Sequence, residues 1–198
     1  MIMLVDNSNG KNWCIDKGCT IIEGENGAGK STLLDIVSGL VKEQNLEIEG
    51  NKSLVYMNQS MFFFDRLKVK DFVKFFYQLD GIKRHREYIE NFNDKLGNIL
   101  DIQGLWDKQV GYLSGGEKKL VYFYIIMSLE REWYLLDEPF AGVDKNRKEI
   151  MKKVINVKLK EDKGIILVTH EDDNADCFIN YKVCKIQNIP ISWKYKLV

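Results

Sequence analysis

The sequence predicts an α/β fold with a mixed, largely parallel sheet, and three observations predict it. Short apolar runs alternate with segments whose apolar residues recur at helical spacing. The runs at 132–138 and 164–170 are almost continuously apolar, as strands of a buried parallel sheet are. A glycine-rich segment, GENGAGKST at 24–32, stands between a predicted strand and a predicted helix. Together these patterns favour strands joined by helices in one layered domain.

The strands follow from the apolar runs and the turn residues that separate them. They are expected at 2–5, 19–24, 46–50, 53–59, 132–138, 164–170, 181–187 and 191–197, the last two near the sheet edge. A helix is expected at 30–41, directly after the glycine-rich segment. Another is expected at 118–127, with an unusually apolar and aromatic composition.

Residues from about 61 to 112 interrupt the alternation, because no strand is predicted there. Apolar residues at helical spacing predict helices at 68–79 and 86–100. The run MFFF at 61–64 suits either the core or a hydrophobic socket for a partner. We expect a single domain, 1–198, with this helical subdomain inserted into the α/β core, since no repeat or low-complexity linker marks a second domain.

The amino-acid composition limits which binding partners and which cellular compartment are expected. The chain has 29 Lys plus Arg and 29 Asp plus Glu, so its formal net charge is zero and nucleic acid is not an expected partner. The four cysteines form no CxxC pair, which favours reduced thiols over a zinc site. No signal peptide is recognised, and no apolar run reaches the ~18–20 residues that a membrane helix needs. A role at a membrane would therefore require another chain.

The glycine-rich segment fits the phosphate-binding pattern GxxxxGK[ST] at Gly24, Gly29, Lys30 and Ser31. Its glycines let backbone N–H groups face phosphates at the start of the helix. Lys30 would supply positive charge to the β- and γ-phosphates, and the Ser31 hydroxyl would ligate Mg²⁺. The pattern predicts a nucleoside triphosphate with Mg²⁺ but does not by itself choose among kinases, GTPases, motors and transport ATPases.

The strand at 132–138 ends in two adjacent acids, Asp137 and Glu138. Side chains alternate along a strand, so these carboxylates should point in different directions. Asp137 can then face the Mg²⁺ through water, while Glu138 reaches an attacking water and polarises it. The pair predicts hydrolysis of the bound nucleotide.

The chain resembles the nucleotide-binding subunit of ATP-binding cassette (ABC) transporters over nearly its whole length. GENGAGKST resembles the Walker A motif, YLLDEP at 134–139 the Walker B motif, and LSGGE at 113–117 the signature motif of that family. Gln59 resembles the Q-loop glutamine, AGVD at 141–144 the D-loop, and His170 the switch histidine. All six stand in the family's order.

The resemblance implies an ATPase that converts ATP to ADP and phosphate and has the ABC ATPase fold on a P-loop NTPase core. It implies catalytic roles for Lys30, Glu138 and His170 and metal roles for Ser31, Gln59 and Asp137. It implies that the nucleotide contacts Asn26, Gly27, Ala28, Gly29, Lys30, Ser31, Thr32, Gln59, Ser114, Gly115, Gly116 and Asp144.

The resemblance also implies partners. Two subunits pack head to tail, so Ser114, Gly115 and Gly116 of one chain would bind the γ-phosphate held by the other. A separate transmembrane permease would hold the pair, expected to be two copies of this chain, at the inner face of the cell membrane. The short insertion favours an exporter or an immunity-type system. The runner-up is an ABC ATPase of DNA repair or the ribosome, and a small-molecule kinase comes third.

One departure concerns the adenine base. The family usually stacks an aromatic residue on adenine from a loop before Walker A, but NSNGKN at 7–12 has none. Trp13 is the nearest aromatic residue and is expected to begin the second strand and pack there. Adenine stacking by this loop is therefore not expected.

Overall fold

The structure is a computed structural model that describes residues 1–8, 10–169, 178–179 and 181–185. The chain divides into two compact units. The first unit is Met1–Gln59, Arg131–Pro139 and Lys158–Val198, and the second is Ser60–Glu130 and Phe140–Val157. The two units are described separately below.

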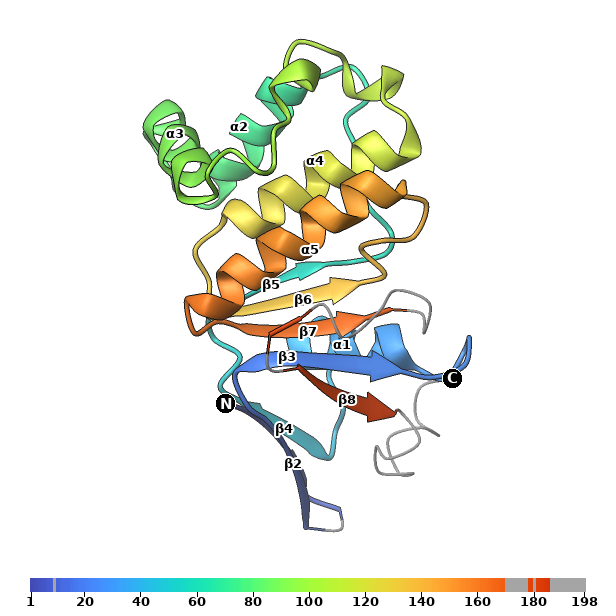
Figure 1. The fold of residues 1–198 in the computed structure, drawn as a ribbon. Coiled ribbons are helices and arrows are strands. Elements are labelled where there is room, and N and C mark those ends of the chain that lie inside the picture. The colour runs from blue at the N-terminus through green and yellow to red at the C-terminus, as the bar shows by residue number, and fades with distance from the viewer. Residues whose placement is uncertain (9, 170–177, 180, 186–198) are drawn as a thin grey trace. The chain divides into compact units, whose positions relative to one another are not determined.

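The first unit holds all the strands and one helix of the described chain (Figure 1). A five-stranded parallel sheet has the order β5-β6-β7-β3-β8, and a three-stranded antiparallel sheet has the order β2-β1-β4. The elements are β1 (Ile2–Asp6), β2 (Lys11–Ile15), β3 (Gly18–Glu23), α1 (Lys30–Ser38), β4 (Leu46–Glu49), β5 (Leu54–Met57), β6 (Trp133–Asp137), β7 (Gly164–Val168) and β8 (Tyr181–Lys185).

The expected α/β class is confirmed, with β6 and β7 buried throughout and β8 at an edge. The structure adds β2, which pairs antiparallel with β1. Gly18, with φ 108°, then begins β3, which corresponds to the expected strand at 19–24, whereas Trp13 belongs to β2. The parallel and antiparallel strands also form two sheets instead of one mixed sheet. The expected strand at 191–197 lies outside the described residues.

The core of the first unit fixes α1 against one face of the parallel sheet. Leu33, Leu34 and Val37 of α1 join a buried cluster with Leu135 of β6 and Ile166 of β7. Burying each such side chain contributes roughly 1.5–3 kcal/mol. Because β3 runs directly into the loop before α1, this packing sets the N-terminus of α1 beside the carboxyl ends of β3 and β6.

The second unit is helical, and residues 61–112, all of which are described, contain no strand. Its elements are α2 (Val69–Leu79), α3 (His85–Lys95), η1 (Gln103–Leu105), η2 (Val110–Tyr112), α4 (Gly115–Ser128) and α5 (Lys145–Lys160), the last belonging to this unit up to Val157. The expected helix at 86–100 ends early, because Gly97 and Asn98 adopt positive φ angles of 59° and 56°.

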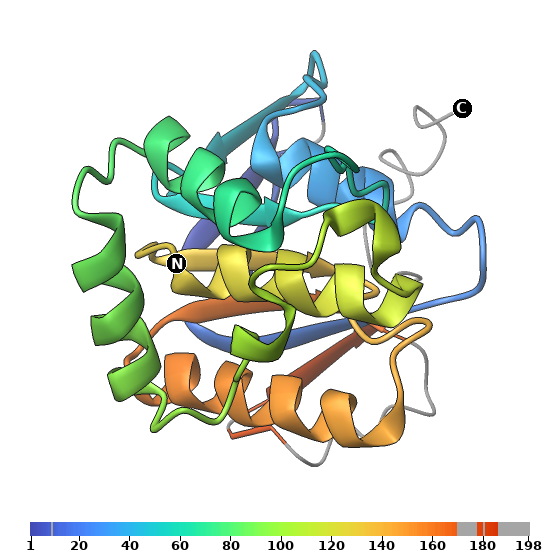
Figure 2. The same ribbon diagram turned by 90° about the horizontal axis from the view of Figure 1, so that it is seen from above.

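Burial explains the apolar composition of α4. The helix lies between α2 and α5 (Figures 1 and 2), and Val121, Phe123 and Ile125 are completely buried. A helix that is hydrophobic on all sides is stable only when it is covered on all sides. The Tyr124 hydroxyl donates to the Asn93 side-chain oxygen at 3.0 Å, which satisfies the polar atom that this residue brings into the core.

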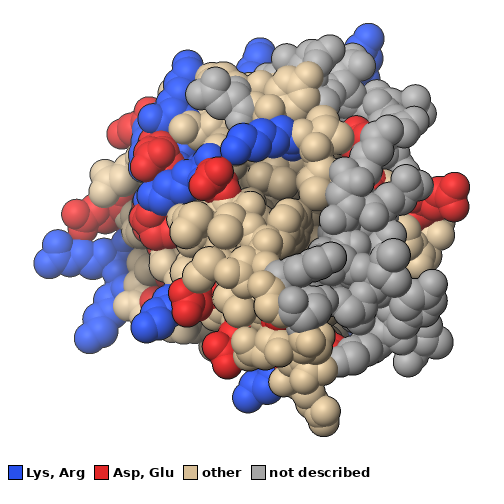
Figure 3. All heavy atoms as spheres, turned by 90° about the horizontal axis from the view of Figure 1, so that it is seen from below, with Lys and Arg blue, Asp and Glu red and all other residues tan. Residues whose placement is uncertain are grey.

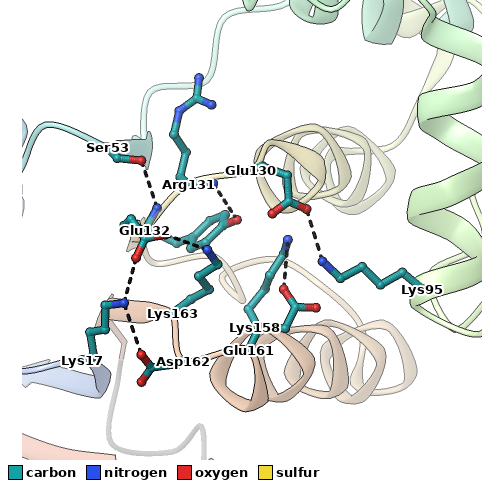
Figure 4. Close-up of polar contacts among 11 residues, drawn as sticks. Lys17, Ser53, Lys95, Glu130, Arg131, Glu132, Lys158, Glu161, Asp162 and Lys163 are labelled. Atoms are coloured by element: carbon teal, nitrogen blue, oxygen red, sulfur yellow. Dashed lines mark hydrogen bonds and ion pairs between the residues drawn. The ribbon is translucent and has the colours of Figure 1, made fainter.

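Charged side chains of both signs are interspersed on the face drawn in Figure 3, consistent with a net charge of zero. In the first unit, the Glu132 carboxylate accepts from the Lys17 ammonium at 2.7 Å and the Lys163 ammonium at 2.8 Å (Figure 4). These lysines, Lys163 first, lower the pKa of Glu132 to about 2. No helix in the described part of the chain is long and apolar enough to span a membrane.

Candidate functional site

The glycine-rich loop leaves the first turn of α1 open. Gly29 is the N-cap residue, with φ 89°, and no side chain of the described residues caps the helix. No acidic residue lies in the first turn. The first N–H groups of a helix lack partners within the helix and carry its positive dipole end. Gly27, with φ 77°, adopts a second left-handed conformation that favours glycine. The local geometry is that of an anion site.

The Lys30 side chain folds back along the loop. Its ammonium group donates to the carbonyl oxygens of Gly24 at 2.7 Å and Glu25 at 2.9 Å. The residue is only 6% exposed. A buried ammonium held by two carbonyl oxygens has one further proton to donate. The cation is therefore fixed beside the open helix terminus.

Asp137 ends β6 on the face of the sheet that α1 covers, and it is 1% exposed. Neither carboxylate oxygen has a well-directed hydrogen-bond partner in the described chain. Burial raises the pKa of Asp137, and the charges of Glu138 and Asp35 raise it further, whereas the Ser31 hydroxyl and Lys30 lower it. A buried carboxylate without a partner beside a serine hydroxyl fits a hard cation such as Mg²⁺, which prefers oxygen ligands.

Glu138 has a conformation that differs from that of Asp137. Its φ of 47° is left-handed, which is uncommon for a residue with a side chain and is associated with functional sites. Its backbone N–H donates to the Val168 carbonyl at 3.0 Å. The Gln59 amide donates to the Glu138 carboxylate at 3.1 Å. The structure therefore brings Gln59 and Glu138 together, at the ends of neighbouring parallel strands.

Two residues near Asp137, namely Asp35 and Tyr56, were not predicted from the sequence. Asp35 lies one helical turn after Ser31, and its charge contributes to the raised pKa of Asp137. Tyr56 lies on β5 opposite Leu135 of β6. The i, i+4 spacing of Ser31 and Asp35 was a signal in the sequence for the first residue. The second required the register between β5 and β6.

In the second unit, the signature segment begins α4 with a completed capping box. The Ser114 hydroxyl accepts from the Glu117 N–H at 3.2 Å, and the Ser114 N–H donates to the Glu117 carboxylate at 2.8 Å. The hydrogen bond from the Ser114 N–H lowers the pKa of Glu117. A Cβ on Gly115 would meet only open space, whereas one on Gly116 would lie 3.2 Å from the Gly142 carbonyl oxygen.

Asp144 begins α5 and lies in the same unit as the signature segment. Its carboxylate accepts from the Arg147 N–H at 3.1 Å and from the Arg147 guanidinium at 3.0 Å. The same guanidinium lies 3.9 Å from the Glu117 carboxylate. Asp144 thus acts as a helix cap, and Arg147 links it electrostatically to the start of α4.

The predicted site residues fall into two groups. The first unit holds Asn26, Gly27, Ala28, Gly29, Lys30, Ser31, Thr32, Gln59, Asp137 and Glu138, and the second holds Ser114, Gly115, Gly116 and Asp144. His170 lies outside the described residues. Trp13 packs partly buried against the core, as expected.

Two other features of the described chain hold none of the predicted site residues. A cavity of about 660 Å³ in the second unit is lined by residues of α2, α3, η1 and α4, among them Trp106 and Tyr124. No disulfide joins the described cysteines, Cys14, Cys19 and Cys184, and no group of three or more His, Cys, Asp and Glu side chains suits a metal within the described residues.

Comparison with known proteins identifies the family. A family model described as "ABC transporter" matches residues 9–141. The chain is 33% identical over 148 residues to an uncharacterised ABC transporter ATP-binding protein of Methanocaldococcus jannaschii, covering 75% of this chain and 56% of that protein. It therefore spans about half the length of that relative.

Two further relatives are covered over most of their length. A cytochrome c biogenesis ATP-binding export protein of Reclinomonas americana is 30% identical, with 82% of this chain and 78% of that protein covered. A petrobactin import ATP-binding protein of Bacillus anthracis is 29% identical, with 86% of this chain and 74% of that protein covered. The solved structure of an ATP binding subunit of an ABC transporter has a TM-score of 0.77 at 19% identity, covering 99% of this chain and 98% of that one, which shows the shared fold.

The matched residues include the phosphate loop at 24–32, the signature segment at 113–117 and the acids Asp137 and Glu138, and the solved structure shares the fold. Proteins of this kind generally bind ATP with Mg²⁺ and hydrolyse it. The chain belongs to the ABC transporter family.

Proposed function

We propose that this chain, working as one ATPase domain, hydrolyses ATP at a site shared by two subunits and so drives a separate membrane permease. The observation that carries the proposal is the arrangement at the carboxyl end of β6. Asp137 is buried, lies beside Ser31 and has no hydrogen-bond partner among the described residues, and Glu138 at the next position accepts from the Gln59 amide. This supports separate roles for the two adjacent acids.

The phosphate loop would hold the triphosphate. Backbone N–H groups from Asn26 to Thr32 would face its oxygens, and the Lys30 ammonium would turn from the loop carbonyls to the β- and γ-phosphates. Ser31, Gln59 and Asp137 would hold Mg²⁺, Asp137 through water. When bound, Mg²⁺ neutralises charge that develops on the phosphates.

Glu138 would act on the attacking water. Its carboxylate accepts a proton from that water as the water attacks the γ-phosphate, and the Gln59 amide keeps the carboxylate oriented. His170 is proposed to contact the γ-phosphate. Neither role requires Asp137 to leave its buried position, since the two acids point in different directions from the strand end.

The signature segment would complete the site of a second subunit. Ser114, Gly115 and Gly116 would contact the γ-phosphate held by the other chain, with Asp144 nearby. Two helix termini facing one polyanion attract it from both sides only while the γ-phosphate is present. Binding would therefore close the pair, and hydrolysis would open it. The second subunit is a copy of this chain or a different cassette.

An exposed aromatic patch supports the permease as a partner. Phe63 packs on Phe72 with ring centroids 5.5 Å apart, so part of the run at 61–64 belongs to the core. Phe62 is 69% exposed, and Phe64 lies against both Phe62 and Phe75 at 5.1 and 5.3 Å. Clustered exposed aromatic side chains are typical of protein interfaces. We propose that Phe62 meets a cytoplasmic segment of the permease, which holds this chain at the inner face of the membrane.

Relatives of this chain include an export protein and an import protein by their names. The short helical insertion favours export by this chain's transporter, in an exporter or immunity-type system. The cargo would be chosen by the permease.

Glu138→Gln tests the proposed ATPase. It should leave ATP binding intact and reduce hydrolysis by roughly 10²–10⁴-fold, the usual contribution of a positioned general base. It should also accumulate an ATP-bound pair of subunits, visible by size-exclusion chromatography. Glu132→Gln is the matched control and should hydrolyse ATP normally. It is the same substitution at the residue that precedes β6, at the opposite end of the strand from Glu138. Normal turnover by Glu138→Gln would overturn the assignment.

A further inference from the structure

The hydroxyl group of Tyr56 has no role in the scheme above. Tyr56 belongs to β5 and packs, partly buried, against the apolar cluster under α1. The ring is sufficient for that packing, and Leu54, on the same face of the same strand, is aliphatic. Yet the hydroxyl oxygen is buried and completes no hydrogen bond within the described residues. A buried polar group without a partner needs a separate explanation.

Strand register places this hydroxyl beside Asp137. Tyr56 lies directly opposite Leu135, and Asp137 follows two residues later on the same face of β6. Such diagonal neighbours on adjacent strands are within reach of aromatic side chains. On α1, which covers this face, Ser31 and Asp35 are one turn apart. The hydroxyl therefore lies among Asp35, Asp137 and the proposed position of the cation.

The electrostatics agree with this placement. Burial raises the pKa of Tyr56, and the charges of Asp137 and Asp35 raise it further, so the hydroxyl keeps its proton. A protonated phenol donates one hydrogen bond. Both carboxylates near it are acceptors, and both Asp137 oxygens lack a completed partner. The Tyr56 hydroxyl is thus one hydrogen-bond donor between two acceptors, the carboxylates of Asp35 and Asp137.

We propose that the Tyr56 hydroxyl donates to the Asp137 carboxylate when a divalent cation is held there, and so orients that carboxylate toward the cation. Tyr56 is a positioning residue that acts through Asp137. The inference rests on the proposed ATPase function, since Asp137 is there assigned to Mg²⁺. Substituting a residue that hydrogen-bonds to a metal ligand typically lowers metal affinity about 10–100-fold.

Tyr56→Phe tests the role by removing only the hydroxyl. Mn²⁺, a spectroscopic substitute for Mg²⁺, is titrated into the full chain with a non-hydrolysable ATP analogue and followed by electron paramagnetic resonance. The dissociation constant for Mn²⁺ should rise about tenfold. Affinity for a fluorescent ATP analogue in EDTA should stay within about twofold of wild type, because the loop and Lys30 are unchanged.

Tyr134→Phe is the matched control. It is the same change on the neighbouring strand β6, at the residue next to Leu135 and therefore on the opposite face of the sheet. It should leave both dissociation constants unchanged. Circular dichroism and thermal melting establish that both variants fold.

The decisive measurement repeats Tyr56→Phe in an Asp137→Asn background. If the hydroxyl acts through Asp137, the change should have no further effect on Mn²⁺ affinity there. A full tenfold effect in that background would overturn the proposal, as would wild-type Mn²⁺ affinity in folded Tyr56→Phe. Loss of nucleotide affinity in EDTA would also overturn it and assign the hydroxyl to the loop. By contrast, unchanged ATP binding in Lys30→Ala would count against the proposed function itself.

Discussion

The N-termini of α1 and α4 differ in whether side chains already cap their first N–H groups. α1 begins at a left-handed glycine with no capping side chain and no acid in its first turn. α4 begins at Ser114, whose hydroxyl is already occupied by the Glu117 N–H, and carries the Glu117 carboxylate in its first turn. Both termini have the same dipole. The capping residues therefore decide which terminus is ready for an anion.

The difference predicts an order of events. α1 can receive phosphate oxygens without losing a side-chain cap, and the Lys30 ammonium is already beside it. α4 presents a carboxylate that repels an anion, although Lys108 and Arg147 lie 3.6 and 3.9 Å from it. Nucleotide should bind at the phosphate loop first. The signature segment should engage only when a second subunit brings it to the bound γ-phosphate.

Lys30→Ala should have the largest effect because it removes the cation beside the uncapped N-terminus of α1. Hydrogen bonds to charged groups contribute about 1.5–3 kcal/mol each, so ATP affinity should fall roughly 100-fold. Fluorescence titration with an ATP analogue measures the loss. Lys30→Arg should also fail, since a planar guanidinium is a poor substitute for a compact ammonium. Wild-type affinity in either variant would remove the phosphate loop from the mechanism.

Ser114→Ala separates the two roles of the capped terminus. Losing the cap should destabilise the protein by about 1 kcal/mol, measured by urea unfolding. If Ser114 also contacts the other subunit's nucleotide, ATPase activity should fall far more than this loss of stability explains, while ATP binding persists. Glu117→Gln keeps both hydrogen bonds but removes the negative charge, so it should tighten ATP-driven pairing about 2–5-fold. Full activity in Ser114→Ala would leave the serine with capping alone.

Glu132→Gln should have the smallest effect, because its carboxylate belongs to neither terminus. Its pKa of about 2 lies below the ordinary value of 4.5, so the ionised form is favoured by folding. The stabilisation is complete above about pH 4.5 and is lost as the pH falls toward 2. The variant should match wild type in acid and melt slightly lower at pH 7, with unchanged ATP affinity. An altered ATP affinity would show that charge changes act on the site from a distance.

The sequence by itself determined the fold class, the order of the motifs and the identity of most proposed site residues. The reason is local: a loop that curls around phosphate requires Gly27 and Gly29 at their positive φ angles, and a buried parallel strand requires a continuous apolar run. The helical subdomain was predicted for the same reason, since its apolar residues recur at helical spacing.

Only the tertiary structure decided which side chains meet. The Gln59–Glu138 hydrogen bond joins residues 79 positions apart, and no periodicity encodes it. The placement of Tyr56 near Asp137 depends on the register of β5 against β6, and a slip of one residue would turn that hydroxyl to the other face. The contrast between the capping box at Ser114 and the uncapped start of α1 required both geometries.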